Sequence, residues 1–446
     1  MESEGKASTR KFLIYGMPRL SAGIVLDTVD FGILFLYIVV YGLPPILSGL
    51  ALAIGKLSIA LGQFSMGWLS DKTKTKYGRR KPFMFFYAPL TAISFICALL
   101  PMIFIQSPSS IILFVWILVF DAIFQWSYGG LTTPYQSWVS EQFIVHQRPK
   151  ASAFQNLFSF IGAAVGIVFT LLIFPPLIEI FQKTRTVDPT FIILVFTFGI
   201  LVIALFYLCA IFLPVEKIEG AEMNFKEDLK KVLKDKNFMK VCWLQGIAFL
   251  AIGMITPSVI GFATLVLKIE GTEFYLIAVC LMVGMMFFLF MWKKLIDKKG
   301  KKQTFLIILL TGIIALPLSL IGLIPGEINI IITIIWVLAI AAFMGGWYLF
   351  PYIWLADLAE DAEVKSGEGR KSGLYAGFPQ ILLNIFQAIA LFITGFILAL
   401  PNVPGKDFSW GYILWGLWCS GILIIAFLFT KKLITLDFEW ENMQLK

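Results

Sequence analysis

Long runs of apolar residues recur along the whole 446-residue chain and are separated by short polar segments. Each run has about 20 residues or more, the length a helix needs to cross the hydrocarbon core of a bilayer. Runs such as 111–120 and 330–343 do not alternate between apolar and polar residues, which disfavours barrel strands. The pattern predicts membrane-spanning helices at 14–42, 45–69, 82–106, 109–138, 151–178, 190–213, 239–267, 272–292, 303–325, 328–355, 373–400 and 409–430.

One long polar stretch, residues 214–238, divides the twelve predicted helices into two sets of six. Within this stretch Phe225, Leu229 and Val232 have helical spacing. This spacing predicts an amphipathic helix that lies on the membrane surface. We therefore expect three regions, which are an N-terminal six-helix bundle over 1–213, a cytoplasmic linker over 214–238, and a C-terminal six-helix bundle with a short cytoplasmic tail over 239–446.

Composition and charge fit a membrane protein. The chain is 59% hydrophobic and 14% charged, whereas soluble proteins carry about 25% charged residues. Most lysines and arginines fall at the termini and in alternate loops, while the other loops hold Lys183, Arg185, Lys268 and Lys406. The positive-inside rule then predicts cytoplasmic termini in a multi-pass protein, which we place in the plasma membrane. The net charge of +8 is explained by contact with anionic lipid and requires no nucleic acid.

The sequence lacks the motifs of common enzyme and cofactor sites. It contains one histidine, no CxxC pair, no Walker loop and no GxSxG or HExxH motif. All five cysteines lie inside apolar runs and are interpreted as core residues. We therefore expect no enzymatic activity, no metal and no cofactor, so that transport energy comes from an ion gradient or from the solute itself.

Two motifs occur once in each half of the chain. The segments 71–81 and 297–302 each place an acid, a glycine and paired cations after a span, and the segments 129–135 and 345–352 each begin with Gly-Gly and end with Pro-Tyr. Repeated bundles are the architecture of alternating access around a central site. The loop motif is predicted to be a conformational latch, with a solvated charged loop as the alternative; its residues are Asp71, Gly78, Arg79, Arg80, Asp297, Gly300, Lys301 and Lys302.

With these motifs the chain resembles the major facilitator superfamily, and within it the glycoside–pentoside–hexuronide cation symporters, the melibiose permease-like family. The resemblance is carried by 67–83, 134–141 and 356–375, and the first segment is also similar to a loop of plant-type sucrose transporters. It implies an all-α membrane fold in which twelve transmembrane helices form two pseudo-symmetric six-helix bundles. It also implies a sugar or glycoside substrate moved together with a cation.

Several binding residues of that family have no counterpart in this chain. The positions matched to its acidic cation ligands on the second helix hold Ile59, Gly62 and Gln63. The positions matched to its sugar-binding acids hold Gly23 and Thr132, and its eleventh-helix lysine falls at or near Asn384. The resemblance therefore transfers the fold without the sodium site, and it favours a proton over sodium as the coupling cation.

Charged residues inside the predicted spans are candidates for that coupling. Each costs about 2.5–3.5 kcal/mol at the middle of a membrane helix, so it usually has a partner and a task. A buried carboxylate near a lysine is charged when paired and protonated when the pair separates. The candidates are Arg19, Asp27, Asp30, Lys56 and Asp121. A static polar contact between helices is the alternative.

Helical spacing predicts two polar stripes. One on the first span comprises Arg19, Gly23, Asp27 and Asp30, and one on the fourth comprises Asp121, Gln125, Tyr128 and Thr132. We expect the stripes to face each other, with Lys56 as the counter-ion of one acid. Amides and hydroxyls beside aromatic rings suit a polyol, so the candidate substrate-binding residues are Gln125, Trp126, Tyr128, Thr132, Trp347, Tyr348, Gln380, Asn384 and Gln387.

The leading hypothesis is a secondary active transporter for a sugar or glycoside that works by alternating access, in symport with a proton, as a monomer in the lipid bilayer. One alternative is a carrier for an organic anion or a lipid-like molecule, and Arg19 and Lys56 would favour an anion. Another alternative is a transporter-like sensor or scaffold that moves no solute.

Overall fold

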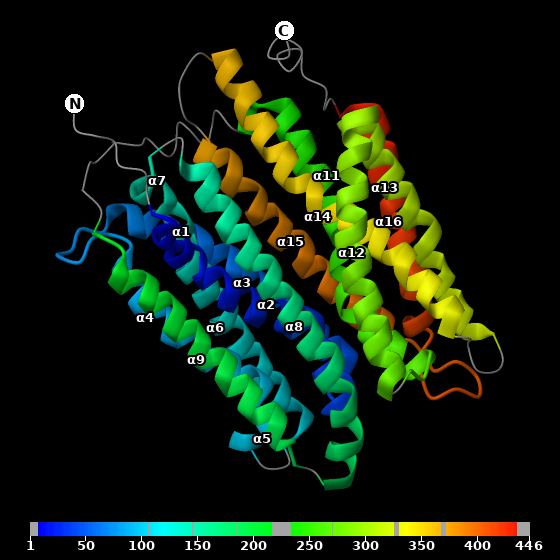
Figure 1. The fold of residues 1–446 in the computed structure, drawn as a ribbon. Coiled ribbons are helices and arrows are strands. Elements are labelled where there is room, and N and C mark those ends of the chain that lie inside the picture. Colours follow the sequence, from blue (N-terminus) through cyan, green and yellow to red (C-terminus); the bar gives the residue numbers. More distant parts are fainter. Residues whose placement is uncertain are drawn as a thin grey trace, which may run out of the picture. The chain divides into compact units, whose positions relative to one another are not determined.

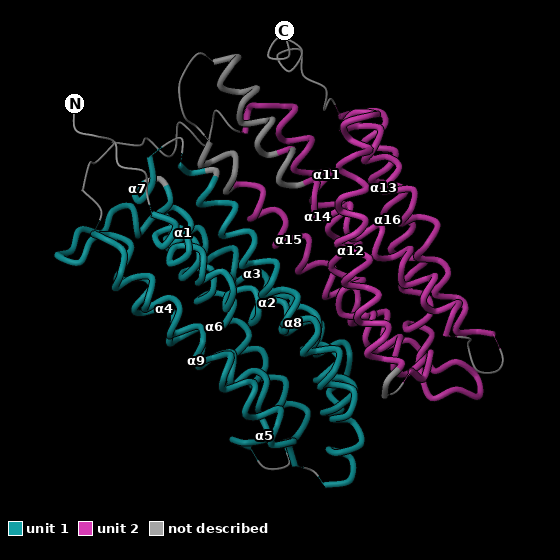
Figure 2. The backbone as a smooth tube through the Cα atoms, in the orientation of Figure 1, with its two compact units in different colours: residues 1–220 teal, residues 221–446 magenta. Residues whose placement is uncertain are grey.

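The computed structural model describes residues 8–105, 108–144, 147–184, 186–215, 233–269, 271–324, 330–366 and 372–434 (Figure 1). Regular structure in these ranges is helical, apart from an isolated antiparallel bridge between Asn402 and Ser409. The chain forms two compact units, Met1–Gly220 and Ala221–Lys446 (Figure 2). Most of the linker predicted at 214–238, including most of its amphipathic helix, lies outside the described residues.

Unit 1 is a helical bundle, and some of its helices begin at capping residues. The Ser109 side chain accepts a hydrogen bond from the Ile112 amide, and the Asp188 side chain accepts from the amides of Thr190 and Phe191. Its elements are α1 (Thr9–Gly16), α2 (Pro18–Phe35), η1 (Leu36–Val40), α3 (Pro45–Lys72), α4 (Lys81–Leu99), α5 (Pro101–Phe104), α6 (Ser110–Ser137), α7 (Val139–Gln142), α8 (Arg148–Thr184) and α9 (Pro189–Phe212).

Unit 2 is a second helical bundle, and Asp235 caps its first helix by accepting from two backbone amides. Its elements are α11 (Lys236–Gly261), η3 (Phe262–Val266), α12 (Gly271–Lys299), α13 (Lys301–Ala315), η4 (Leu316–Leu323), α14 (Ile330–Ser366), α15 (Ser372–Leu398) and α16 (Gly411–Leu433).

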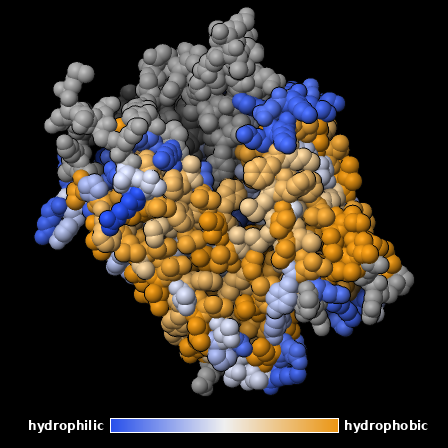
Figure 3. All heavy atoms as spheres, viewed as in Figure 1, coloured by the Kyte–Doolittle hydropathy of each residue, from blue (hydrophilic) through white to orange (hydrophobic). Residues whose placement is uncertain are grey.

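Twelve helical segments in the described part of the chain are long and apolar enough to cross a membrane. On the face seen in Figure 3, hydrophobic residues cover the middle of the helices of each unit and hydrophilic residues gather at helix ends. The predicted all-α fold with twelve spans is therefore confirmed. Most boundaries agree within several residues; the second span, for example, was predicted at 45–69 and is Pro45–Lys72. The largest difference is in the tenth, which was predicted to end at 355 and whose helix continues to Ser366.

The two units pair their helices in the same way. In unit 1, α2 packs against α8, α3 against α6 and α4 against α9. In unit 2, α11 packs against α15, α12 against α14 and α13 against α16. In both units, therefore, the first span packs on the fifth, the second on the fourth and the third on the sixth, which is the internal repeat that the sequence motifs predict.

The repeated Gly-Gly pairs lie where helices cross closely. A Cβ atom on Gly129 would be 2.8 Å from the Ile59 carbonyl oxygen of α3, and one on Gly345 would be 2.7 Å from the Met285 carbonyl oxygen of α12. The second glycine of each pair faces the third span of its own unit. Only glycine allows the backbones to approach this closely, so the motif is explained by packing inside each bundle.

A lysine also ties the third span to the end of the sixth in each unit. The Lys81 ammonium donates to the Leu213 carbonyl after α9 at 2.7 Å, and the Lys302 ammonium donates to the Ile434 carbonyl after α16 at 2.8 Å. The last carbonyls of a helix lack partners within the helix and carry partial negative charge, so a cation stabilises them. The repeat therefore extends from helix pairing to individual hydrogen bonds.

Candidate functional site

An ion pair between α2 and α3 lies at the centre of the candidate site. The Lys56 Nζ atom is 2.5 Å from Asp30 Oδ1, and the two side chains are 3% and 17% exposed. Lys56 occupies the middle of α3, where an unpaired charge would cost several kcal/mol, and its carboxylate partner offsets that penalty. The structure thus gives the predicted counter-ion a partner, and the partner is Asp30.

Asp121 lies on the other side of α3, on α6, and is fully buried. Its Oδ2 atom is 1.8 Å from the place where a Cβ on Gly55 would be, so the carboxyl group rests on the backbone next to Lys56. The Gln125 amide donates to Asp121 Oδ1 at 3.4 Å, while Oδ2 has no hydrogen-bond partner among the described residues. Asp121 therefore contacts the second span through a glycine.

Arg19 connects α2 with two other helices. Its guanidinium donates to Ser159 Oγ on α8 at 3.1 Å and also interacts with the Tyr128 hydroxyl on α6. Asp27 is half-buried on α2, close enough to Arg19, Asp30 and Lys56 to be affected by their charges. We refer to Arg19, Asp27, Asp30, Lys56 and Asp121 together as the charge cluster.

Gly23 differs from the other members of the predicted stripe on the first span. A Cβ atom at this position would lie 2.9 Å from the Ser159 carbonyl oxygen and 3.0 Å from the Ala163 amide nitrogen of α8. The α2 backbone at Gly23 is therefore pressed against α8, which leaves no room for a carboxyl side chain. This packing gives a physical reason why the family's sugar-binding acid has no counterpart here.

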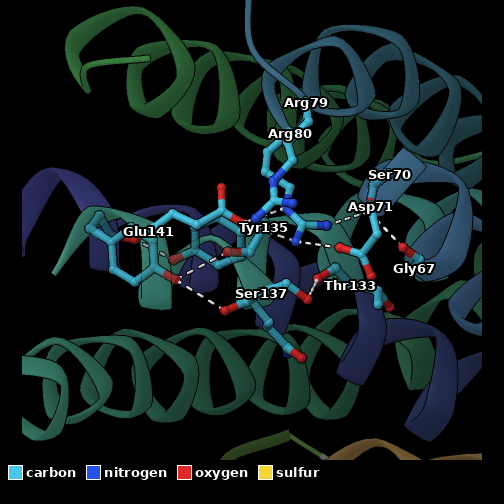
Figure 4. Close-up of polar contacts among 11 residues, drawn as sticks. Gly67, Ser70, Asp71, Arg79, Arg80, Thr133, Tyr135, Ser137 and Glu141 are labelled. Carbon is cyan, nitrogen blue, oxygen red and sulfur yellow. Dashed lines mark hydrogen bonds and ion pairs between the residues drawn. The ribbon is translucent and has the colours of Figure 1, made fainter. Parts of the chain in front are cut away.

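The loop after α3 forms a second ionic site (Figure 4). Arg80, which is 4% exposed, lies 2.6 Å from Asp71 and 3.0 Å from Glu141, and donates to Ser70 Oγ at 2.5 Å. Arg79 lies 2.5 Å from the same Glu141 oxygen. Gly78 has a φ of +91°, which permits the turn that brings both arginines back toward α7. The acid and cations of the unit 1 motif are therefore in contact.

Glu141 is a member of this network that the sequence motif did not single out. It appeared only inside the segment 134–141 that carries the family resemblance. In the structure it lies on α7, is 10% exposed, and pairs with both arginines. A sequence signal did exist, since Glu141 is an acid directly after the fourth span and the loop after the second span holds paired arginines.

In the equivalent loop of unit 2, the described residues show no ion pair between the acid and the paired lysines of the motif. Asp297 is exposed and makes no ion pair within the described residues, and Lys302 binds the Ile434 carbonyl instead. The difference lies in chain length, because only Gly300 separates α12 from α13, whereas residues 73–80 separate α3 from α4. In unit 1, by contrast, a longer loop follows α3 and folds back on Asp71. The motif is therefore similar in sequence and different in structure.

The substrate-binding candidates of unit 1 lie along α6. Gln125, Tyr128 and Thr132 are buried, and the Thr132 hydroxyl donates to the Tyr128 carbonyl at 2.8 Å. Trp126 is half-buried, and its ring meets Tyr87 of α4 edge-on at 5.4 Å between ring centroids. Gln125 and Tyr128 are thus the two candidates that contact the charge cluster.

The candidates of unit 2 lie on two helices. Trp347 of α14 is 1% exposed, with its ring near those of Phe249 and Phe305, so it is a core residue of this unit. Tyr348 is half-buried. On α15, Gln380 is exposed, Asn384 is buried and Gln387 is half-buried. The predicted amide-bearing face of α15 therefore spans both accessible and buried positions.

Solved structures of major facilitator transporters share this fold at low sequence identity. A nucleoside transporter, NupG, is 13% identical, with a TM-score of 0.64 over 95% of this chain and 100% of that chain. A D-xylose–proton symporter is 14% identical, with a TM-score of 0.64 over 95% and 97% of the two chains. The inward-open xylose transporter XylE from E. coli gives 14% identity, a TM-score of 0.63 and coverage of 97% and 98%.

A shorter sequence match was found with a protein from Synechocystis that is described as an uncharacterized symporter. The two are 38% identical over 72 residues, which is 16% of this chain and only 13% of that protein. The family profile described as "MFS/sugar transport protein" matches residues 14–431, nearly the whole chain. The chain therefore belongs to this MFS/sugar transport protein family, and it is a multi-pass secondary transporter, not an enzyme, with the major facilitator fold.

Proposed function

We propose that the protein moves a sugar or glycoside across the membrane by alternating access, in symport with a proton. The observation that carries this proposal is the buried Lys56–Asp30 ion pair with the fully buried Asp121 beside it. Ionisable groups in the middle of membrane helices are expensive and are typically kept where they take part in ion movement. The three acids and two cations of the charge cluster, all in unit 1, are ionisable groups of this type.

The choice of a sugar rests on the family and on the residue types available. The profile of this family is described as a sugar transport protein, and one solved structure with the same fold is that of a D-xylose–proton symporter. The α6 residues Gln125 and Tyr128 and the α15 residues Gln380, Asn384 and Gln387 offer amides and a hydroxyl, the groups that hydrogen-bond a polyol.

The choice of a proton rests on the kind of charged groups present. Ile59, Gly62 and Gln63 occupy the positions matched to the family's acidic cation ligands, which removes the basis for its sodium site. The carboxylates of the charge cluster are instead accompanied by an ammonium and a guanidinium. A carboxyl group in such surroundings alternates between a paired charged form and a neutral protonated form.

An organic anion as the solute receives less support. Arg19 and Lys56 are the two cations inside the unit 1 spans, and the Lys56 ammonium is already paired with Asp30. Arg19 alone would then have to balance the charge of the anion. A role as a static sensor gives no reason for the ionic network of Asp71, Arg80 and Glu141 at a loop between spans.

We further propose that both termini are cytoplasmic, that the protein functions as a monomer, and that it resides in the plasma membrane. The concentration of lysine and arginine in the termini and alternate loops supports this orientation. Impermeant labelling of tags placed at each end of the chain tests it. Labelling of either end from outside intact cells would contradict the orientation.

The deciding experiment is uptake into proteoliposomes with a panel of labelled sugars, under an imposed pH gradient or an imposed sodium gradient. We expect accumulation of one sugar class under the pH gradient and none under sodium alone. Asp121→Asn should lose accumulation while it retains exchange of labelled for unlabelled sugar. Asp407→Asn, which changes an exposed carboxylate, is the control and should match the wild type. Accumulation driven by sodium alone, or full accumulation by Asp121→Asn, would refute proton coupling at this cluster.

A further inference from the structure

We propose that Asp121 is the carboxyl group that binds the coupled proton, and that Lys56 competes with this proton by exchanging Asp30 for Asp121. The proposal rests on the proton-coupled function above and deepens it. It assigns a proton site, a competing cation and a stoichiometry of one proton per turnover, and these follow from charge balance, burial and one close contact.

The first step is the charge balance of the cluster. Its five residues are two cations, Arg19 and Lys56, and three carboxyl groups, Asp27, Asp30 and Asp121. With every group ionised, one negative charge remains uncompensated. An unpaired charge in a low-dielectric interior costs several kcal/mol, and neutralisation by a proton relieves that cost. The cluster therefore has a place for one proton.

The second step assigns that proton to one carboxyl group. Asp30 already has an ammonium partner at 2.5 Å, and Asp27 is half-buried near the Arg19 guanidinium. Asp121 is 0% exposed, and its Oδ2 atom has no hydrogen-bond partner among the described residues. Gln125 contributes only a long hydrogen bond of 3.4 Å to the other oxygen, and no part of the Asp121 side chain reaches water, so neither water nor a strong hydrogen bond stabilises its charged form.

The third step is the close contact that brings Lys56 within reach. Asp121 Oδ2 lies where a side chain on Gly55 would begin, and Gly55 directly precedes Lys56 on α3. A lysine ammonium is a point charge on a flexible four-carbon stem, so a change of rotamer can redirect it without movement of the helix. The same ammonium can therefore serve Asp30 on α2 or Asp121 on α6.

The surroundings of Asp121 offer few competitors for its proton. The charged groups that act on it are Lys56 of α3 and Asp30 of α2. The hydroxyl of Tyr37, in η1 at the end of the first span, is also nearby, but it donates to the Ala98 carbonyl at 2.8 Å. Among the described residues, Lys56 is thus the cation that can replace the proton on Asp121.

These steps define a cycle with a neutral loaded cluster and a released cluster that carries one net negative charge. In the loaded form Asp121 is a neutral carboxylic acid, and Lys56 neutralises Asp30. On release the O–H bond of Asp121 breaks, the proton passes to water, and the carboxylate that remains accepts Lys56. Asp30 then loses the Lys56 ammonium, and its 17% exposure allows water to solvate it. One proton is bound and one is released per cycle.

Infrared difference spectroscopy of the purified protein, titrated from acid to alkaline buffer, tests the assignment without any solute. Above about pH 5, where ordinary Asp and Glu side chains are ionised, the carbonyl stretching band of a protonated carboxylic acid should be present in the wild type and in Asp30→Asn and absent from Asp121→Asn. Persistence of the band in Asp121→Asn would overturn the proposal. Thermal unfolding of each variant, measured in detergent, confirms that the comparison is made on folded protein.

If Lys56 competes with the proton, two variants should move the pH at which the band disappears in opposite directions. In Asp30→Asn the ammonium loses its first partner and binds Asp121, so the band should disappear at lower pH than in the wild type. In the double variant Lys56→Met/Asp30→Asn the cation is absent, and the band should persist to higher pH. We expect each shift to be about one pH unit or more, which is tenfold in proton affinity. Identical midpoints in the two variants would overturn the competition. Uptake that is insensitive to the pH gradient would overturn the proposed function instead, so the two failures are distinguishable.

Discussion

At the scale of single residues, Gly55 determines how closely Asp121 can approach α3. An alanine here would place a Cβ atom 1.8 Å from Asp121 Oδ2 and 2.8 Å from its Cγ, so the carboxyl group or the helix must move. Overpacking of a tight interior typically costs about 1–3 kcal/mol. We predict that Gly55→Ala lowers the free energy of unfolding by about this amount in detergent and abolishes proton-driven accumulation.

A matched control for this substitution is Gly421→Ala. Gly421 is in helix α16, and no atom lies within 4 Å of its added Cβ. The same change there removes backbone freedom from the unfolded chain without a clash, and alanine is favoured over glycine in a helix by about 0.5–1 kcal/mol. Equal effects of the two substitutions on stability would show that Asp121 does not rest on Gly55.

The residues of the charge cluster illustrate what a sequence can and cannot specify. Hydropathy alone was enough to single out Lys56 and the three acids, because charges are rare inside apolar runs. Helical spacing could not select Asp30 as the partner of Lys56, since that depends on how α2 lies against α3. Spacing also grouped Gly23 with the polar residues, although its backbone packs against α8. The importance of Gly55 became apparent only from the packing.

At the scale of helices, the first spans of the two units end in the same unusual way. A turn of π-helix, η1 in unit 1 and η3 in unit 2, is followed after one residue by a positive φ, +73° at Gly42 and +52° at Lys268. Lys268 is the one non-glycine residue with positive φ in the described chain. A non-glycine residue in this region costs about 1–2 kcal/mol. We predict that Lys268→Gly raises the unfolding free energy by about 1 kcal/mol and that Gly42→Ala lowers it by a similar amount.

Thermal or denaturant unfolding in detergent measures both changes, and Lys406→Gly serves as the control. Lys406 is an exposed loop lysine without positive φ, so glycine there only increases the freedom of the unfolded chain and should give no gain in stability. If Lys268→Gly and Lys406→Gly shift stability equally, the backbone at Lys268 is not strained.

Span positions could be predicted from the sequence because bilayer thickness fixes the length of an apolar run. The type of helix within a span could not. The segments LYIVV of η1 and FATLV of η3 are almost entirely apolar and fit an α-helix equally well. Their widened turns are closed by hydrogen bonds that span five residues, from the Tyr41 amide to the Leu36 carbonyl and from the Leu267 amide to the Phe262 carbonyl.

At the scale of the whole molecule, the two units resemble each other closely in backbone packing but differ in their charged contacts. Both units share the same helix pairs, the same glycine crossings and the same lysine tie to the sixth span. Within the described residues, the buried ion pairs belong to unit 1. The sequence motif at 297–302 predicted a second latch because it preserves the residue types. The shorter connection between α12 and α13 prevents them from meeting.

This asymmetry predicts graded effects for three neutralised acids. Glu141 is 10% exposed and pairs with both Arg79 and Arg80, so Glu141→Gln removes the buried carboxylate that the two guanidinium groups share, and breaking a buried pair typically costs about 3–5 kcal/mol. Asp71 is 54% exposed, and Asp71→Asn should cost under about 1 kcal/mol, as is usual for a surface ion pair. Asp297 has no ion pair in the described chain, so Asp297→Asn should stay within about 0.5 kcal/mol of the wild type.

Unfolding in detergent ranks the three variants, and uptake assays show whether Glu141→Gln also changes the transport rate. If the second motif were a working latch, Asp297→Asn would be as damaging as Asp71→Asn. Equal losses in the two units would therefore contradict the structural difference between the loops. A loss confined to Glu141→Gln would instead show that the two units share their helix packing while the stabilising ionic network belongs to unit 1 alone.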